Sequence, residues 1–510
     1  MKSLNTKSKS LVKTGKKYFA GGSHAKIDYN LREFDVIFVG GLLAANTLKY
    51  LQHTGFHGTM AGFNTKSKFY NEHHYEYLVH GNIPPFKYMA MAFNSNYNVE
   101  QSAYYPNRIV DIKPNENKVI DDKGNTFSYK SLVLNTGLNQ HYTNLPFLQK
   151  LVENDDLAHS RVFVHQPSNE EQFDRNRRIF GMHKDNDVIV YLPKYPNRRE
   201  AYDAWYLGLD TFLSWGVHSE AHHSKMKIRV ITPNDNLFKF PFANEVVMEE
   251  ISQRAMIETH FGYELENVEV VDKGINAKAR YATFKNTKTG ETMRVPFGTL
   301  LLSPPNKKRE LFNNNDIADE DGQVKVNPYS LQHVKYPNIF ALGDCTNVDT
   351  TKSFYASVNQ QVVVRNNLSD YLNGNDFKAV YNGYSSFAVG HSIDRTWIFS
   401  HYYDYKPSFA NFYVPRFLGL FNYKFKCSLE KQFFNKIFQG KPNFGYPYLS
   451  KNKYFRPIEE NKFVKERGLK REDIMSHAKN PPVLSFHHHH DHHEHCHHKK
   501  GDNHAHTAAH

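Results

Sequence analysis

The stretch VIFVGGLLAAN, residues 36–46, decides the fold class. An apolar strand ends in a glycine pair and runs into a helical pattern, which is how a dinucleotide-binding βαβ unit begins. In that motif the first glycine makes the tight turn, the second lets a pyrophosphate approach the backbone, and the third allows close helix packing. Here Gly40 and Gly41 form the turn, Leu42 stands at the second glycine position, and Ala45 replaces the third. The sequence therefore predicts a dinucleotide-type scaffold with an altered phosphate turn.

Length and composition bound the class of protein. The chain has 510 residues, enough for two or three domains, and 40% of them are hydrophobic. No run approaches about 18 to 20 apolar residues, so we expect no transmembrane helix. The net charge of +12 favours anionic partners such as lipid or acidic protein surfaces. No arginine-rich aromatic module is present, so we expect no nucleic-acid partner.

Cysteine usage and the N-terminus bear on the compartment. The three cysteines, Cys345, Cys427 and Cys496, form no CxxC pair, which excludes a disulfide framework and suits a reducing compartment. The first 27 residues contain seven lysines and no acidic residue. Basic, acid-poor segments of this kind are typical of mitochondrial presequences, and a disordered basic tail is the alternative for residues 1–33.

The rest of the chain has an α/β pattern. A hairpin with a DKGN turn leads into the strand SLVLNTG (131–137), and two further buried strands, DNDVIVYLP (185–193) and MKIRVITP (226–233), flank a predicted helix. NIFALGDCT (338–346) is a short apolar strand ending in Gly-Asp, followed by a helix over 353–374. These patterns predict a second βαβ unit nested within the first.

Three features in this order carry a family resemblance: the VGG turn, the strand ending NTG, and YPNIFALGDCTN (336–347) followed by a lysine, a helix and an aromatic C-terminal segment. The chain resembles the two-dinucleotide-binding-domain flavoproteins and, among them, sulfide:quinone oxidoreductase of the mitochondrial type, over roughly residues 34–425. The resemblance implies an α/β fold with two Rossmann-like domains, one nested in the other. The implied divisions are a basic presequence or tail (1–33), an FAD-type domain (34–150 and 300–375), an NAD-type domain (151–299), a C-terminal sheet and amphipathic segment (376–457), and a charged, His-rich disordered tail (458–510).

The resemblance also implies roles for single residues near a flavin. Asp344 matches the Asp that binds the ribityl chain, with capping of the next turn as the alternative. Thr136 and Gly137 match a turn that passes the cofactor. Lys352 matches a lysine near the flavin and quinone end, and the alternative is a solvated side chain.

The sequence departs from the family where sulfide chemistry takes place. The family needs two redox cysteines facing the flavin, because only a thiolate combines this nucleophilicity with reversible oxidation. Arg199 stands at the first position and Phe387 at the second, and no cysteine precedes residue 345. We therefore expect no catalytic residue.

The expected cofactor site is weakened as well. Leu42 stands where the pyrophosphate needs a glycine, and Phe63 stands where an acidic residue should bind the adenosine ribose. The expectation is a vestigial or weak FAD site built from Gly40, Gly41, Ala45, Thr136, Gly137, Asp344 and Lys352. The turn after the second strand pattern, KYPNRRE (194–200), lacks glycines, so we expect no NAD.

Two C-terminal segments suggest contacts rather than catalysis. The stretch 414–448 interleaves aromatic and basic residues, as in helices that lie in a membrane interface or pack on a partner. Its contact residues would be Phe417, Leu418, Leu420, Phe421, Phe433, Phe434, Ile437 and Phe438. The last 24 residues hold twelve histidines. They predict metal binding in vitro through His487, His488, His489, His490, His492, His493, His495 and Cys496.

These observations lead to one main hypothesis and two alternatives. The main hypothesis is a degenerate sulfide:quinone oxidoreductase-like protein that serves as an accessory or structural subunit of a mitochondrial inner-membrane complex of the respiratory chain. Its partners would be other subunits and, peripherally, the membrane. The first alternative is an active FAD-dependent oxidoreductase that passes electrons to quinone. The second is a metal-binding protein that acts through its His-rich tail.

Overall fold

The computed structural model describes residues 30–53, 56–65, 68–70, 90–92, 102–139, 145–154, 159–164, 187–195, 227–253, 257–272, 278–392, 395–408 and 460–475. Residues 1–29 of the basic N-terminal segment, Arg199, the aromatic segment 414–448 and the His-rich residues 487–510 lie outside these ranges. Within them, no helix is long and apolar enough to cross a membrane.

The first sheet is the one predicted from the VGG turn. Its strands run parallel in the order β5-β2-β1-β8-β17, where β17 pairs with the second half of β8. A β6–β7 hairpin adds antiparallel strands to the first half of β8, through the predicted DKGN turn. The bounds are β1 Glu33–Gly40, β2 Met60–Phe63, β5 Ser102–Tyr105, β6 Ile109–Lys113, β7 Lys118–Asp121, β8 Thr126–Asn135 and β17 Ile339–Ala341.

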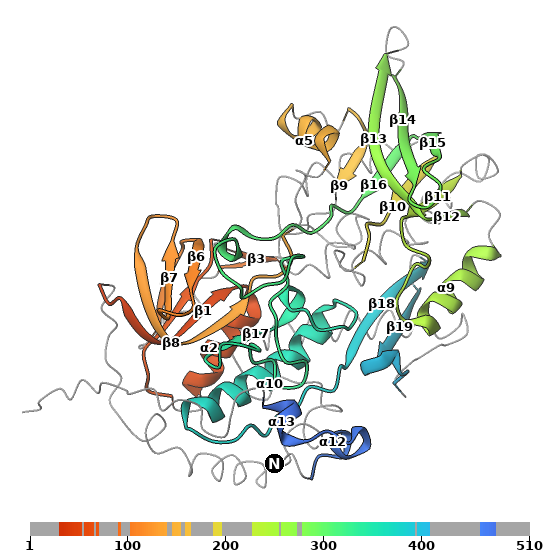
Figure 1. Cartoon of the computed structure of the whole chain (residues 1–510). Helices are drawn as coiled ribbons and strands as arrows, with labels where there is room; N and C mark the ends of the chain where they lie inside the picture. The colour runs from red at the N-terminus through yellow and green to blue at the C-terminus, as the bar shows by residue number, and fades with distance from the viewer. Residues whose placement is uncertain are drawn as a thin grey trace, which may run out of the picture.

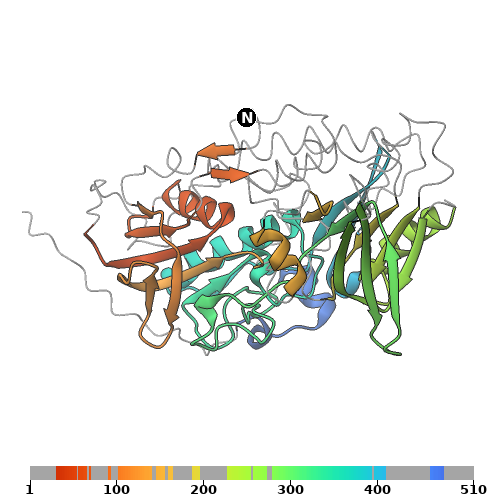
Figure 2. The same ribbon diagram turned by 90° about the horizontal axis from the view of Figure 1, so that it is seen from above.

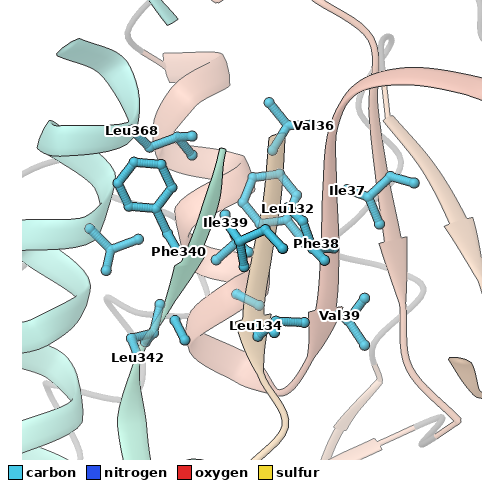
Figure 3. Packing of buried hydrophobic residues seen from close by; sticks show 14 of the residues in the cluster. Val36, Ile37, Phe38, Val39, Leu132, Leu134, Ile339, Phe340, Leu342 and Leu368 are labelled. Carbon is cyan, nitrogen blue, oxygen red and sulfur yellow. The ribbon is translucent and has the colours of Figure 1, made fainter. Parts of the chain in front are cut away.

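Two helices pack beside this sheet. Helix α2 (Leu42–His53) follows β1 directly, and α10 (Phe354–Leu372) follows β17 and contacts α2. The parallel-paired segments VIFVG of β1, MAGF of β2, LVL of β8 and IFA of β17 are apolar, as expected for parallel strands covered by helices. Figure 3 shows side chains of β1, β8 and β17 packed together with Leu368 of α10.

The second sheet is parallel throughout, in the order β12-β11-β10-β16-β9. Its bounds are β9 Val162–Val164, β10 Val188–Tyr191, β11 Ile228–Thr232, β12 Ile257–Phe261 and β16 Thr299–Leu302. An antiparallel sheet of β13 (Tyr263–Asp272), β14 (Lys278–Asn286) and β15 (Thr292–Pro296) projects from it (Figure 1). All these strands lie between β8 and β17 in the chain. The predicted fold class, with one Rossmann-like domain nested in the other, is thus confirmed.

Smaller elements complete the description. They are β3 Lys68–Tyr70, β4 Ala90–Ala92, α5 Pro146–Glu153, α9 Pro241–Ser252, β18 Ser385–Ser392, β19 Arg395–His401, and the short 3-10 helices η3 Glu310–Phe312, η4 Gly343–Cys345 and η5 Tyr403–Tyr405. Strands β18 and β19 form an antiparallel hairpin. Both views place the two parallel sheets toward opposite ends of the described part, with α10 between them and the hairpin beside the second sheet (Figure 1, Figure 2).

The C-terminal boundary differs from the prediction. A disordered tail from residue 458 is wrong for residues 460–475, which form α12 (Lys462–Arg467) and α13 (Arg471–Ile474). Val464 and Ile474 are buried against Val380, and Asn327 donates a hydrogen bond to the Asp473 carbonyl at 2.8 Å. The charged composition concealed these few apolar contacts, which are enough to fold the segment back onto the first domain.

Candidate functional site

The candidate site is the edge where β1, β8 and β17 end. Gly40 has φ of +117°, and a Cβ built there would lie 2.2 Å from the Asn135 carbonyl oxygen. The next amide, of Gly41, donates to the same oxygen at 2.9 Å. Only glycine allows this approach of the two strand ends, so the predicted tight turn has a direct structural reason.

A second glycine turn faces the first. Gly343 has φ of +80°, and its amide donates to Oε1 of Gln360 on α10 at 2.7 Å. Between the two turns lies Asn135, whose Nδ2 donates to the Leu342 carbonyl at 3.0 Å. Sequence analysis did not single out Asn135 or Gln360, because their partners lie far along the chain.

Asp344 and Cys345 follow this turn in η4, and both are buried. The Cys345 thiol donates to the Leu342 carbonyl at 3.3 Å. Burial raises the pKa of this thiol above its ordinary value, in spite of nearby amides from Thr136 and Gly137. A buried thiol that stays protonated is inert, so Cys345 offers packing rather than a reactive thiolate.

Lys352 lies beside the same turn. Its ammonium donates to the Thr346 carbonyl. Burial lowers the pKa of Lys352, and the Asp344 carboxylate opposes this as the largest of the favourable charges. Lys352 and Asp344 are thus brought together at the edge of the sheet, and the side chain of Lys352 is half-buried.

Arg309 holds the turn after β8. Its Nη2 donates to the carbonyls of Thr136, at 2.7 Å, and Leu138, at 3.0 Å. Gly137, between them, has φ of +65° with open space where a Cβ would lie. Burial lowers the pKa of Arg309. No local signal in the sequence marks this arginine, since its partners are about 170 positions away.

The two departures from the dinucleotide motif lie near the C-terminal end of β1. Leu42 is the first residue of α2 and packs against the hydrophobic core, and Ala45 is buried as helix packing requires. Phe63 ends β2, where its ring stacks on Tyr105 with a centroid distance of 4.8 Å. It also meets the edge of Phe127 at 4.9 Å, so the position expected to bind a ribose carries core packing.

The edge fits a flavin dinucleotide only in part. The tight turn at Gly40 and Gly41 fits a dinucleotide edge, and Thr136, Gly137 and Asp344 follow the ends of the neighbouring strands β8 and β17. The side chain at Leu42 and the absence of any carboxylate in β2 do not fit, because the pyrophosphate needs a bare backbone and the adenosine ribose needs an acceptor. These residues therefore do not support a conventional FAD site.

The position of the second expected redox cysteine is filled by an aromatic core. Phe387 on β18 is 2% exposed and stacks on Phe238, with a centroid distance of 5.7 Å and an interplanar angle of 22°. Phe399 on β19 packs on it from the other strand at 5.6 Å. Among the described residues of this region there is no cysteine and no group of three or more His, Cys, Asp or Glu side chains that could hold a metal.

Comparison with known proteins gives the relationship. No family model matches the chain. A relative from Schizosaccharomyces pombe, named mitochondrial sulfide:quinone oxidoreductase, is 27% identical over 286 residues, which are 55% of this chain and 58% of the relative. The match thus spans a little over half the length of this curated relative, and mouse and Dictyostelium discoideum relatives of the same name match over similar shares. The chain is sulfide:quinone oxidoreductase-like.

Solved structures agree with this relationship at the level of fold. The sulfide:quinone oxidoreductase of Aquifex aeolicus matches 81% of this sulfide:quinone oxidoreductase-like chain with a TM-score of 0.61 and 13% identity, over 92% of its own length. A chain in the mitochondrial F1Fo ATP synthase of Tetrahymena thermophila matches 83% of it with a TM-score of 0.71 and 22% identity, over the whole of its own length. At these identities both likenesses concern the fold.

Proposed function

We propose that this chain is a catalytically degenerate sulfide:quinone oxidoreductase-like protein that serves as a structural subunit of a mitochondrial inner-membrane complex. The observation that carries the proposal is the buried Phe387. The family resemblance places a redox thiol at that position, and here three aromatic rings occupy it. A phenyl ring can neither form the disulfide that sulfide attacks nor carry sulfur as a persulfide, so the scaffold is kept without that chemistry.

The cysteine inventory supports the loss of activity. Sulfide oxidation through a disulfide needs two thiols that reach each other and a flavin. No cysteine precedes residue 345, and the thiol of Cys345 is buried with a raised pKa. The two remaining cysteines, Cys427 and Cys496, lie outside the described residues and 69 positions apart.

The proposed assembly rests on different support. The curated relatives are named as mitochondrial, and the lysine-rich N-terminus suits import. The ATP synthase chain of Tetrahymena thermophila shares this fold over its whole length. Among inner-membrane complexes, the ATP synthase is therefore the first to test. Contact with the membrane would be peripheral, and the aromatic basic segment 414–448 is the proposed contact.

The experiment is native isolation. Mitochondrial membranes are solubilised in mild detergent, complexes are separated by native electrophoresis, and the chain is located by mass spectrometry. Co-migration with ATP synthase or another inner-membrane complex is expected, with a soluble matrix enzyme as the control that stays in the low-mass fraction. Recovery as a free protein that reduces quinone with sulfide would disprove the proposal.

One specific observation supports a second candidate function. Asp344 and Lys352 both lie at the strand edge, where the Asp344 carboxylate raises the pKa of Lys352, and the resemblance places both residues near a flavin. An active FAD-dependent oxidoreductase that passes electrons to quinone would use this edge. The visible spectrum of the native complex separates the two candidates, because flavin bands in amounts equal to this chain favour the enzyme. Metal binding by the His-rich tail is a weaker proposal, tested by deleting residues 487–510.

A further inference from the structure

The two glycine turns at the strand edge are joined by one side chain. Asn135 ends β8 and projects between Gly41, at the β1–α2 turn, and Gly343, at the β17–η4 turn. A Cβ built on Gly41 would lie 3.4 Å from Oδ1 of Asn135, and one built on Gly343 would lie 2.7 Å from its Nδ2. The carboxamide therefore has one end at each turn.

This place is where a dinucleotide fold binds its ligand. In such folds the pyrophosphate lies outside the carboxyl ends of the strands, at the N-terminus of the first helix. Here that helix begins at Leu42, immediately after Gly41. The carboxamide of Asn135 lies beside this helix start and crosses from the first turn to the second.

The carboxamide also donates a hydrogen bond to the Leu342 carbonyl, which without it would need a ligand or a water molecule as its partner. Its Nδ2 donates to the Leu342 carbonyl at 3.0 Å, while its own backbone carbonyl accepts from the Gly41 amide at 2.9 Å. One residue thus ties β1, β8 and β17 together at their ends. Buried or half-buried polar groups need such partners, and here the chain supplies them itself.

We propose that Asn135 is a built-in substitute for the dinucleotide: its carboxamide fills the gap between the two glycine turns and, with Leu42, excludes the pyrophosphate. This inference deepens the proposed function by naming the residue that makes the edge self-sufficient. In a scaffold protein the Asn135 carboxamide stabilises the sheet edge, because the edge is then complete without a cofactor.

The test measures FAD uptake by four forms of the full chain: wild type, Leu42→Gly, Asn135→Ala and the double variant. FAD is added in excess, unbound flavin is removed by gel filtration, and retained flavin is read from its absorbance. Thermal midpoints are recorded with and without FAD. We expect no retained flavin in wild type, a small FAD-dependent rise in midpoint for Asn135→Ala, and retained flavin in the double variant.

Asn338→Ala is the matched control. Asn338 also donates from its Nδ2 to a backbone carbonyl, that of Lys130 at 3.1 Å, but it lies just before β17, opposite the middle of β8 and away from the two glycine turns. The same Nδ2 also donates to Oδ1 of Asn117 at 2.8 Å. Each asparagine variant should lower the midpoint without FAD by about 1 to 4 °C, as expected for the loss of one side-chain hydrogen bond at Asn135 and two at Asn338. Only Asn135→Ala should gain a response to FAD.

Two results would overturn the proposal. One is stoichiometric flavin retained by wild type, and the other is full uptake by Leu42→Gly alone. If the double variant does not fold, the FAD-dependent midpoint of Asn135→Ala decides, and its absence counts against the proposal. Failure here leaves the subunit role standing, because that role is read from co-migration in native membranes.

Discussion

The ring of Phe387 lies almost parallel to that of Phe238, with centroids 5.7 Å apart, and this stack joins the C-terminal hairpin to the second domain. The same face becomes polar toward the open end of the hairpin, where Ser385 pairs with His401. The Ser385 hydroxyl donates to the Thr351 carbonyl at 2.8 Å, and His401 contacts the Thr351 hydroxyl at 2.9 Å. One hairpin therefore binds the second domain through aromatic rings and the first domain through hydrogen bonds, which fixes the two domains relative to each other.

Replacing Phe387 should destabilise the whole chain. Because the ring is 2% exposed and packs on Phe238 and Phe399, Phe387→Ala should lower the free energy of unfolding by about 3 to 5 kcal/mol. Urea denaturation followed by tryptophan fluorescence measures the change. Val271→Ala is the control, because Val271 is 40% exposed and its loss should cost about 0.5 kcal/mol or less. A loss below about 1 kcal/mol for Phe387→Ala would contradict the role of the stack.

His401 should make the hairpin sensitive to acid. Its Nδ1 donates to the Tyr402 carbonyl at 2.8 Å, and so its Nε2 accepts from Thr351. Burial lowers the pKa of His401 to about 4, although the Asp349 carboxylate acts in the opposite direction. The folded pKa lies below the unfolded value near 6.5, so stability is complete above pH 6.5 and falls as the pH drops toward 4, by about 3 kcal/mol in total.

The measurement for His401 is a series of urea denaturations between pH 7 and pH 4.5. His401→Phe should be less stable than wild type at pH 7 but should lose less stability as the pH falls. Equal slopes for the two proteins would show that His401 does not titrate in this range.

Asp370 on α10 should have the opposite pH dependence. Burial raises the pKa of Asp370 to about 6, so the protonated form is favoured in the folded state. Stability from this group is complete below the unfolded pKa near 4 and is lost as the pH rises through 6. Asp370→Asn keeps an acceptor for the Lys378 amide and should stabilise the chain by about 1 to 2 kcal/mol at pH 7.5, after allowance for solvent screening. At pH 4.5 the gain should be much smaller, and a gain that is the same at both pH values would rule out the titration.

The folded C-terminal segment can be tested through Ile474. This side chain is fully buried on α13, against the first domain. Ile474→Ala should therefore cost about 2 to 4 kcal/mol in the free energy of unfolding. Glu472→Ala, an exposed change in the same short helix, is the matched control and should cost about 0.5 kcal/mol or less. If Ile474→Ala had no effect on the free energy of unfolding, residues 460–475 would not be folded against the first domain and would belong to the predicted tail.

The sequence could predict what depends on neighbours along the chain. Gly40 and the apolar strands gave the nested α/β fold, because a glycine turn between a strand and a helix is a local signal. The absence of the first redox cysteine could also be predicted, because it follows from the positions of the cysteines in the sequence and does not depend on the fold. The contacts of Asn135, Arg309 and Phe387 were not readable, because each partner is distant in sequence. Residues 460–475 were missed for a related reason: two buried apolar side chains outweigh a charged composition.

The nesting of one domain in the other has a consequence for biogenesis. Asn135 and Leu342, which meet at the completed sheet edge, are 207 positions apart. A ribosome or an import channel that delivers the chain from its N-terminus releases β8 first, then all strands of the second sheet, and only afterwards β17. During that interval the second half of β8 has an unpaired edge, which is the kind of surface that aggregates or is held by chaperones. The inner domain can finish folding first, and the outer domain that encloses it in the sequence must be the last to close.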